Sequence, residues 1–257
     1  MNNIAEVFQR GKAFIPFVTV GDPTLEVTER LLPAMAEAGA DLIEVGIPFS
    51  DPVAEGPVIQ QADIRALAAG TTTDKIFEML ERAAPRCKAA LAIMTYINPV
   101  FTYGTGRFLA RCAKAGVAAI IVPDVPFEEK EELSPYCKQY GVELISMIAP
   151  TSHDRIRRIA AEAEGFLYCV SSMGVTGVRR ELGDQAAEMV AAVRQVSKIP
   201  CAVGFGISTP EQAKRMAAFA DGVIVGSAIV KLAEQYGRDC VEPIVDYVRQ
   251  MKGALCG

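Results

Sequence analysis

The sequence predicts an α/β fold, a (β/α)8 TIM barrel with an extra helix at its N-terminus. The chain has 257 residues, and barrels of this kind typically have about 250. Eight short apolar runs alternate with segments of helical periodicity, which indicates parallel strands joined by crossover helices. Three helices stop at a glycine, Gly39, Gly116 or Gly141, that leads into the next run. Eight units favour a closed barrel over a doubly wound sheet, and no linker divides residues 1–257, so we expect one domain.

The elements are expected in a regular order. An amphipathic helix over 3–10, with Ile4, Val7 and Phe8 on one face, precedes the first strand. Thr24 is placed to cap the helix after that strand. The expected strands cover 13–20, 41–46, 89–96, 117–122, 142–148, 166–171, 201–204 and 222–225. The expected helices cover 24–38, 58–69, 73–84, 105–115, 128–140, 153–163, 184–196 and 210–219, with two more starting at 228 and 241.

Composition excludes several classes of protein. Apolar residues make up 51% and charged residues 22%, which suits a large core and argues against disorder. The net charge of −5, from 26 basic and 31 acidic residues, argues against a nucleic-acid surface. Seven scattered cysteines without a CxxC pair indicate a reducing compartment. The N-terminus lacks the apolar run of a signal peptide, and no run could span a membrane. We therefore expect a soluble, cytoplasmic protein.

The stretch 41–60, DLIEVGIPFSDPVAEGPVIQ, joins a strand to a stiff, proline-containing loop. Side chains alternate along a strand, so Glu44 projects from a largely apolar face. The loop that follows carries Asp51 and Glu55. A carboxylate at a strand end and a second on the next loop could form an acid/base pair. The alternative is that Glu44 is a structural carboxylate and the loop acids are solvated.

Two glycine motifs follow the seventh and eighth expected strands, where barrels of this type commonly bind phosphate. GFGIS contains Gly206, and GSA contains Gly226 and Ser227. Glycines let the backbone approach an anion, and a helix beginning after Ser227 would point free N–H groups at it. Together the two motifs predict a phosphate site, although either alone could serve only a tight turn.

Several kinds of catalysis lack the residues they need. The single histidine, His153, lies at an expected helix start, where a capping or surface role is the better interpretation. One histidine and no clustered cysteines argue against a dedicated metal site. No lysine lies inside an expected strand, so a Schiff-base mechanism lacks its nucleophile. Carbon–carbon cleavage would therefore have to use carboxylates and an electron sink within the substrate.

Seven motifs resemble the tryptophan synthase α subunit family, in order from about Phe14 to Lys231. They are PFVTVGDP, DLIEVGIPFSDPVAEGPVIQ, MTYINPVF, VPDVPFEE, GVTG, VGFGIS and VGSAIVK. The resemblance implies a (β/α)8 barrel. It also implies a carbon–carbon lyase activity that splits indole-3-glycerol phosphate into indole and glyceraldehyde 3-phosphate. It implies no cofactor or metal in this chain. It also implies a β subunit partner that uses pyridoxal phosphate to join indole to serine in an αββα tetramer, the last step of L-tryptophan biosynthesis.

The resemblance also implies catalytic roles. Glu44 matches the glutamate that acts as general acid at indole C3 and as base on the glycerol hydroxyl, and burial should raise its pKa. Glu55 stands where the family commonly has an aspartate, AEGP in place of ADGP, and would take up the charge that develops at the indole N–H. The extra methylene adds about 1.5 Å of reach. Tyr168 matches a tyrosine near the substrate.

The remaining matched positions fall into three groups. Residues expected to contact the substrate, most of them lining an apolar slot for indole, are Phe17, Met94, Tyr96, Thr176 and Phe205. Residues expected to hold the phosphate are Gly177, Gly206, Gly226 and Ser227, with the basic pair Arg179 and Arg180 nearby. Residues in the motif that resembles the partner-contacting segment are Asp51 and Pro52. Loop 172–180 is expected to be a mobile lid that closes when Thr176 reaches Glu55.

Three alternatives to this lyase remain open at this stage. Another phosphate-sugar barrel, an isomerase or ring-closing synthase, would usually need a histidine or lysine at a strand end, and none is found. A barrel that has lost activity and only regulates a partner is disfavoured by the presence of both Glu44 and Glu55. A stand-alone lyase that releases indole without a β subunit would be distinguished by the absence of a larger pyridoxal enzyme on co-purification.

Overall fold

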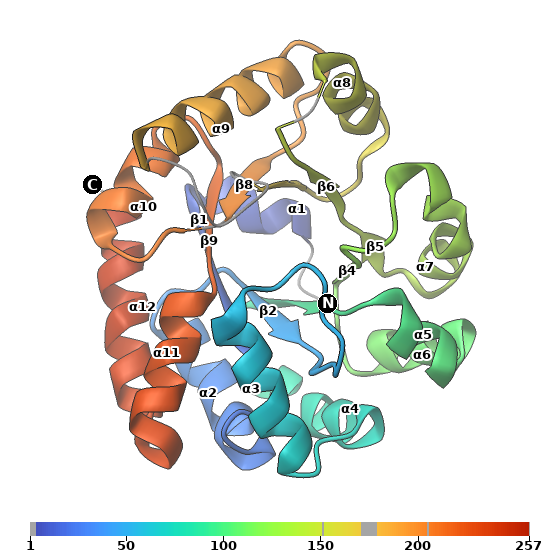
Figure 1. The fold of residues 1–257 in the computed structure, drawn as a ribbon, viewed down its shortest axis with the longest axis vertical. Coiled ribbons are helices and arrows are strands. Elements are labelled where there is room, and N and C mark those ends of the chain that lie inside the picture. The colour runs from blue at the N-terminus through green and yellow to red at the C-terminus, as the bar shows by residue number, and fades with distance from the viewer. Residues whose placement is uncertain (1–3, 151, 171–178, 205, 257) are drawn as a thin grey trace.

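The structure is a computed structural model, and it describes residues 4–150, 152–170, 179–204 and 206–256. Nine strands form one parallel sheet in the order β5-β4-β3-β2-β1-β9-β8-β7-β6. The strands are β1 Ala13–Thr19, β2 Leu42–Gly46, β3 Ala90–Met94, β4 Ala119–Ile121, β5 Glu143–Leu144, β6 Ser146–Ile148, β7 Leu167–Val170, β8 Cys201–Gly204 and β9 Gly222–Val225. Because β5 and β6 end this order yet are consecutive in the chain, the sheet curls into a nearly closed barrel (Figure 1). This confirms the expected barrel.

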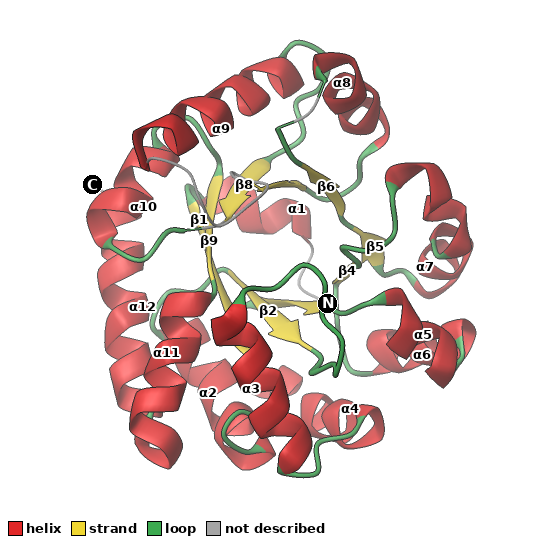
Figure 2. Ribbon diagram, viewed as in Figure 1, coloured by secondary structure: helices red, strands yellow, loops and turns green. Residues whose placement is uncertain are grey.

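Helices surround the strands, as Figure 2 shows. The α-helices are α1 Ile4–Val7, α2 Leu25–Glu37, α3 Pro57–Ala68, α4 Thr73–Ala83, α5 Ile97–Tyr103, α6 Thr105–Lys114, α7 Ser134–Tyr140, α8 His153–Glu162, α9 Arg179–Arg194, α10 Pro210–Ala217, α11 Ser227–Tyr236 and α12 Val241–Leu255. Short 3-10 helices cover Phe8–Arg10, Ala84–Arg86, Phe127–Glu132 and Gly237–Asp239. In the described part of the chain, none of the helices is long and apolar enough to span a membrane.

The fifth strand differs from the expected continuous run over 142–148. It is divided at Ile145, with β5 pairing with β4 and β6 pairing with β7. Ile145 still donates its N–H to the carbonyl oxygen of Ile120 at 2.9 Å, and its side chain joins the core inside the barrel. The chain therefore pairs with β4 before Ile145 and with β7 after it, and this change of partner closes the barrel.

Two expected helices are organised differently. The segment 128–140 forms a 3-10 helix over Phe127–Glu132 and then α7, in which Pro135 occupies an early position. Proline is tolerated in the first turn of a helix but disrupts the interior, so the new helix starts just before it. Helix α9 begins at Arg179 rather than 184, so the expected loop 172–180 ends earlier than predicted. Helix α5 was not predicted from the sequence.

Alternation along the strands separates two apolar cores. One lies between the barrel and its helices, and it includes Ile43 and Val45 of β2. The other fills the barrel, and it includes Leu42 of the same strand, as period-two side-chain orientation requires. Helix α1 and the turn after it close the N-terminal end of the barrel, where the Phe8 and Phe166 rings lie 5.4 Å apart. The loops that follow the strands lie at the opposite end of the barrel, and the polar residues discussed below lie at that end.

Candidate active site

Glu44 points into the barrel from the middle of β2. Its register partners are Phe17 on β1 and Ala92 on β3. The residue is 1% exposed, and its Oε1 has no hydrogen-bond partner in the described part of the chain. Burial raises the pKa of the Glu44 carboxyl to about 8, because the charged form loses its hydration. At neutral pH, Glu44 is therefore a protonated acid inside an apolar barrel.

Tyr168 of β7 lies close to both predicted carboxylates. Burial, followed by the negative charges of Glu44 and Glu55, raises the pKa of its phenol well above the ordinary value. Gly204 on the neighbouring strand makes room for this ring, since a Cβ at position 204 would come within 2.8 Å of the Tyr168 hydroxyl. The structure thus brings Glu44, Glu55 and Tyr168 together from β2, the loop after it and β7.

Glu55 is half-buried at the end of the loop before α3. Its Oε2 is buried and has no hydrogen-bond partner among the described residues. Burial raises the pKa of the Glu55 carboxyl to about 7, and the charge of Asp124 adds to this, while the backbone N–H groups of Glu55 and Ala54 oppose it. Close to neutrality, Glu55 can therefore exist with or without its proton.

Side chains from two elements hold the Glu55 loop in place. The Tyr96 hydroxyl accepts a hydrogen bond from the N–H of Ala54 at 2.8 Å, and its ring lies 5.4 Å from that of Phe49. From the other side, the Gln60 side-chain amide of α3 donates to the Glu55 carbonyl oxygen at 2.9 Å. The position of the Glu55 backbone is thus set by the segment after β3 and by α3 together.

Of the predicted phosphate positions, Gly226 and Ser227 lie at the start of α11 and Gly206 precedes α10, and these two helices differ in their capping. Helix α10 is closed by a capping box, in which Thr209 and Gln212 each bond a backbone N–H of the other. Helix α11 begins at Ser227, and Gly226 at its N-cap supplies no side-chain cap. Gly206 adopts the positive φ of 71° that favours glycine. The uncapped end of α11 leaves backbone N–H groups available to an anion.

Phe17 and Met94 contribute to a small apolar cluster at the mouth, which also includes Ala62 of α3 and Val230 of α11. The Phe17 ring packs over Gly46, where an added Cβ would come within 2.5 Å of a ring carbon. Tyr96 is buried and, as described above, is engaged with the acidic loop. These three predicted slot residues therefore lie on β1, at the end of β3 and just after β3, on either side of the β2 strand that carries Glu44.

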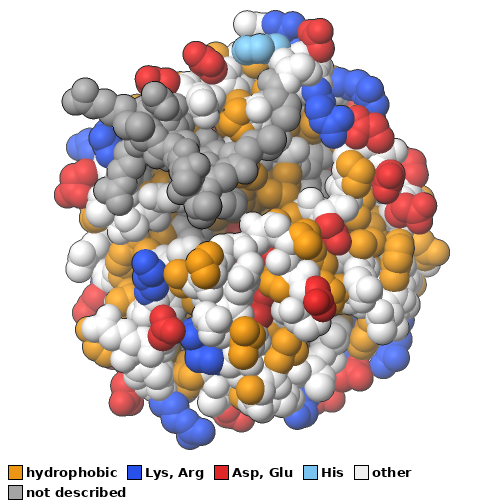
Figure 3. Space-filling view, in the orientation of Figure 1, with side chains coloured by type: hydrophobic (Ala, Val, Ile, Leu, Met, Phe, Trp, Pro, Cys, Tyr) orange, Lys and Arg blue, Asp and Glu red, His pale blue; other side chains and the backbone are white. Residues whose placement is uncertain are grey.

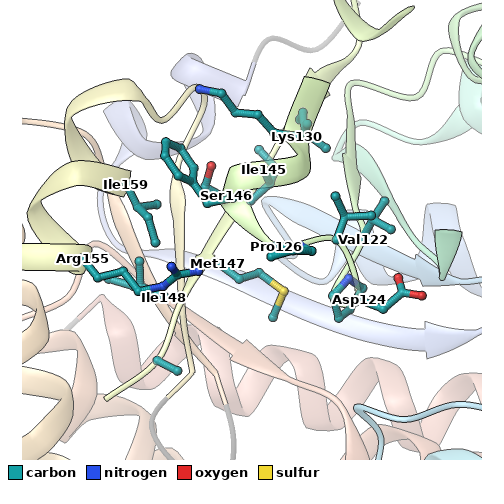
Figure 4. A pocket seen from close by; sticks show the side chains of 15 residues that line it. Val122, Asp124, Pro126, Lys130, Ile145, Ser146, Met147, Ile148, Arg155 and Ile159 are labelled. Carbon is teal, nitrogen blue, oxygen red and sulfur yellow. The ribbon is translucent and has the colours of Figure 1, made fainter. Parts of the chain in front are cut away.

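A pocket of about 360 Å³ adjoins this site between β4, β6 and α8 (Figure 4). Apolar side chains such as Val122, Met147 and Ile148 line it, together with Asp124. Its two cations are already paired, Lys130 with Glu162 and Arg155 with Glu128. The pocket therefore offers an apolar wall next to Asp124 rather than a free positive charge.

The structure describes only some of the remaining predicted residues. Thr176, Gly177 and Phe205 lie outside the described residues, as does the lid segment 171–178. Arg179 and Arg180 begin α9. Asp51 is exposed and Pro52 half-buried on the acidic loop. His153 is the exposed first residue of α8, which agrees with a surface role. In the described ranges, no group of three or more His, Cys, Asp or Glu could hold a metal ion.

Two polar groups at the mouth were given no role in the sequence interpretation, which placed Thr19 at the end of the first strand and did not consider Asp63. Thr19 ends β1 facing the barrel, and its hydroxyl is buried without a partner in the described part of the molecule. Asp63 of α3 is 5% exposed. The signal for Asp63 was its position on the apolar stripe of α3, next to Ala62 and one turn before Ala66, where a carboxylate is unusual.

Comparison with known proteins relates the whole chain to one family. The family model described as tryptophan synthase alpha chain matches residues 5–255. The alpha chain of Lacticaseibacillus casei is 46% identical over 255 residues, covering 99% of this chain and 96% of the relative. That of Geobacter sulfurreducens is 48% identical over 226 residues, covering 88% and 86%. The Legionella pneumophila alpha chain structure has a TM-score of 0.89 at 36% identity, covering 100% of this chain and 98% of that chain.

Proposed function

The chain belongs to the tryptophan synthase alpha chain family, and on this premise we propose that Glu44 and Glu55 are its catalytic carboxylates. It is a carbon–carbon lyase that cleaves indole-3-glycerol phosphate to indole and glyceraldehyde 3-phosphate. The observation that carries the assignment is the Glu44 carboxyl inside the barrel, whose Oε1 has no hydrogen-bond partner among the described residues and whose pKa is raised to about 8 by burial. An acid that keeps its proton at neutral pH can protonate carbon.

The proton movements of the cleavage can be assigned to the two carboxylates. Glu44 donates its proton to indole C3, and the positive charge that develops at the indole nitrogen is stabilised by the ionised Glu55. The Glu44 carboxylate then removes the proton of the glycerol hydroxyl on the carbon attached to C3. The carbon–carbon bond breaks, its electrons restore the indole ring, and the hydroxyl carbon becomes the aldehyde of glyceraldehyde 3-phosphate. Glu44 recovers its proton, so the chain needs no cofactor for this step.

The remaining predicted residues support binding in this proposal. Gly206, Gly226 and Ser227 receive the phosphate at the uncapped start of α11, with Gly177 completing the site. The indole ring lies against Phe17, Met94, Tyr96 and Phe205, next to Glu44 and Glu55. Tyr168 contacts the substrate beside Glu44, and Thr176 closes over Glu55 when the substrate is bound. The same N–H groups should bind inorganic phosphate in a crystal soak.

Indole release by the purified chain tests the role of Glu55. Glu55→Ala should lower kcat/KM by about 10²-fold, because the charge at the indole nitrogen is left unbalanced. Glu55→Asp is the sharper variant, since a displacement of order 1 Å can itself cost about 10²-fold. We expect Asp to be slower than Glu, because Tyr96 and Gln60 hold the loop backbone where the longer acid fits. A Glu55→Ala variant as active as wild type would remove this residue from the mechanism.

We also propose that the chain works with a β subunit in an αββα tetramer in the cytoplasm, and that the partner carries pyridoxal phosphate. A solved tryptophan synthase from M. tuberculosis has a chain related to this one at 29% identity, with a TM-score of 0.87 and 98% of each chain covered. Asp51 and Pro52 lie on the acidic loop beside Val53, which is 79% exposed, and Phe101 of α5 is 50% exposed. On the face in Figure 3, apolar side chains lie between a few acidic and basic ones, and most of the charged side chains lie towards the rim.

Co-elution with a purified β subunit on size exclusion tests this interface. Phe101→Asp should abolish co-elution, since it places a charge in the apolar contact. Val196→Asp, which changes an equally exposed valine after α9, is the matched control and should co-elute as wild type does. Wild-type chain that elutes alone at micromolar concentration with every β subunit tried would instead support a stand-alone lyase.

A further inference from the structure

The loop 206–209, which joins β8 to α10, is anchored at Ser208 by side chains from two helices. The N–H of Ser208 donates to Oε1 of Gln212, in the first turn of α10, at 2.8 Å. The carbonyl oxygen of Ser208 accepts a hydrogen bond from the hydroxyl of Tyr247 at 3.0 Å. Tyr247 lies on α12, 39 positions further along the chain. The tertiary fold therefore holds this loop from both backbone polar groups of one residue.

Helix α12 is the element from which Tyr247 reaches the loop. It packs against both α10 and α11, the helices that follow β8 and β9 (Figure 1). Tyr247 is half-buried and packs against the core between the barrel and its helices. Burial raises the pKa of its phenol to about 12, because the charged form would lose hydration. The hydroxyl therefore keeps its proton at neutral pH and remains a hydrogen-bond donor to Ser208.

Gly206 lies two residues before this anchor. It is exposed at its positive φ of 71°, and nothing lies within 4 Å of a Cβ built there. A glycine has no side chain that could hold its peptide groups in place, so their position depends on the neighbouring anchors. Oε1 of Gln212 also accepts the N–H of Thr209 at 3.1 Å, and Thr209 Oγ1 accepts that of Gln212 at 3.3 Å. The cap thus occupies those N–H groups, which supports Gly206 as the phosphate contact of this loop.

We propose that Tyr247 is a positioning residue for substrate binding, whose hydrogen bond to Ser208 fixes the loop after β8 so that Gly206 presents its backbone N–H to the substrate phosphate. The inference rests on the proposed phosphate site. Tyr247 acts through the backbone in this role and touches no atom of the substrate. Without the hydrogen bond, the loop would have to be ordered when the phosphate binds, and that cost weakens binding. The phosphate is not a reacting group, so the loss should appear in KM rather than in kcat.

Steady-state kinetics of Tyr247→Phe test this proposal, since the change removes the hydroxyl and keeps the ring. The KM for indole-3-glycerol phosphate and the inhibition constant of inorganic phosphate should both rise about three- to tenfold, the range expected for one hydrogen bond. The kcat should stay within about twofold, and the inhibition constant of indole, which has no phosphate, should not change. Tyr236→Phe, the same change at the exposed last residue of α11, is the matched control and should alter none of these constants.

A tyrosine with only a structural role would lower the Tm of the variant, or its kcat, without moving the inhibition constant of phosphate, and that result would overturn the proposal. Tyr247→Leu provides a second variant without the hydroxyl, and it should raise the same two constants at least as much. If Tyr247→Phe binds phosphate as wild type does while Ser227→Asp raises KM, Tyr247 takes no part and the phosphate site stands. If Ser227→Asp and Ser227→Asn have the same KM, the proposed phosphate site itself is wrong.

Discussion

The two ends of the barrel both bury carboxylates, but they surround them differently. At the N-terminal end, Glu143 of β5 packs close to Gly165 and Ile4, and its Oε2 has no partner among the described residues. Burial, followed by the charge of Glu164, raises the pKa of Glu143. At the mouth, Glu44 is buried, its Oε1 has no partner in the described part of the chain, and burial raises its pKa as well.

The difference lies in the groups that surround each carboxylate. Glu44 has Tyr168 and Glu55 beside it, and the mouth also holds the uncapped helix α11. Near Glu143, by contrast, the apolar side chains of the N-terminal helix α1 close the barrel. A raised pKa therefore reports burial at both ends, whereas a second acid, an anion-binding helix end and an apolar wall occur together only at the mouth in the described structure. The predictions below test that distinction.

The largest expected effect separates the buried Glu44 from the half-buried Glu143. Glu44→Gln should lower kcat by at least about 10²–10⁴-fold, the usual cost of losing a general acid/base, because the same group serves two steps. Glu143→Gln should retain turnover within about twofold. Both values come from steady-state indole release, with circular dichroism showing that the fold is intact. Equal losses in the two variants would mean that burial, not the site, explains the importance of Glu44.

The pH profile should show two limbs that both originate at the mouth. Glu44 must be protonated, and its pKa of about 8 means that activity falls as the pH rises through that value. Glu55 must be ionised, and its pKa of about 7 means that activity falls as the pH drops through that value. A narrow maximum between these values is expected, with about tenfold loss per pH unit beyond each limb. A flat kcat/KM between about pH 6 and about pH 9 would contradict both assignments.

A charge at the start of α11 should weaken binding rather than chemistry. Ser227→Asp places a carboxylate where the substrate phosphate is proposed to bind, so KM should rise by about tenfold or more with kcat changed less. Ser227→Asn, which is close in size and neutral, is the control and should show a much smaller rise. If the two variants have the same KM, the phosphate lies elsewhere.

The smallest expected effect is on stability, and it comes from the packing around Tyr168. Gly204→Ala should lower the free energy of unfolding by about 1–3 kcal/mol, because its Cβ overlaps the Tyr168 hydroxyl. Gly253→Ala in α12 meets nothing within 4 Å and should instead stabilise the fold by about 0.5–1 kcal/mol. Urea unfolding of the two variants measures the contrast. Similar stabilities would show that Tyr168 can move away at little cost.

The sequence by itself determined the alternation of strands and helices and the direction of Glu44. Runs of period two and segments of period 3.6 are local properties, so strands and helices could be predicted without a partner. The alternation of Leu42, Ile43 and Glu44 then required that the glutamate share a face with Leu42, and the structure places both inside the barrel. The glycine stops before the strands were equally local signals.

Only the tertiary structure decided features that depend on residues distant in the chain. Helix α5 starts where the Asp124 carboxylate accepts the N–H of Ile97, a contact between positions 27 apart. The break at Ile145 follows from pairing with two different strands. The burial of Asp63 depends on how α3 packs on the barrel. Hydrogen-bond partners and desolvation are set by which surfaces meet, and a single sequence does not contain that distance information.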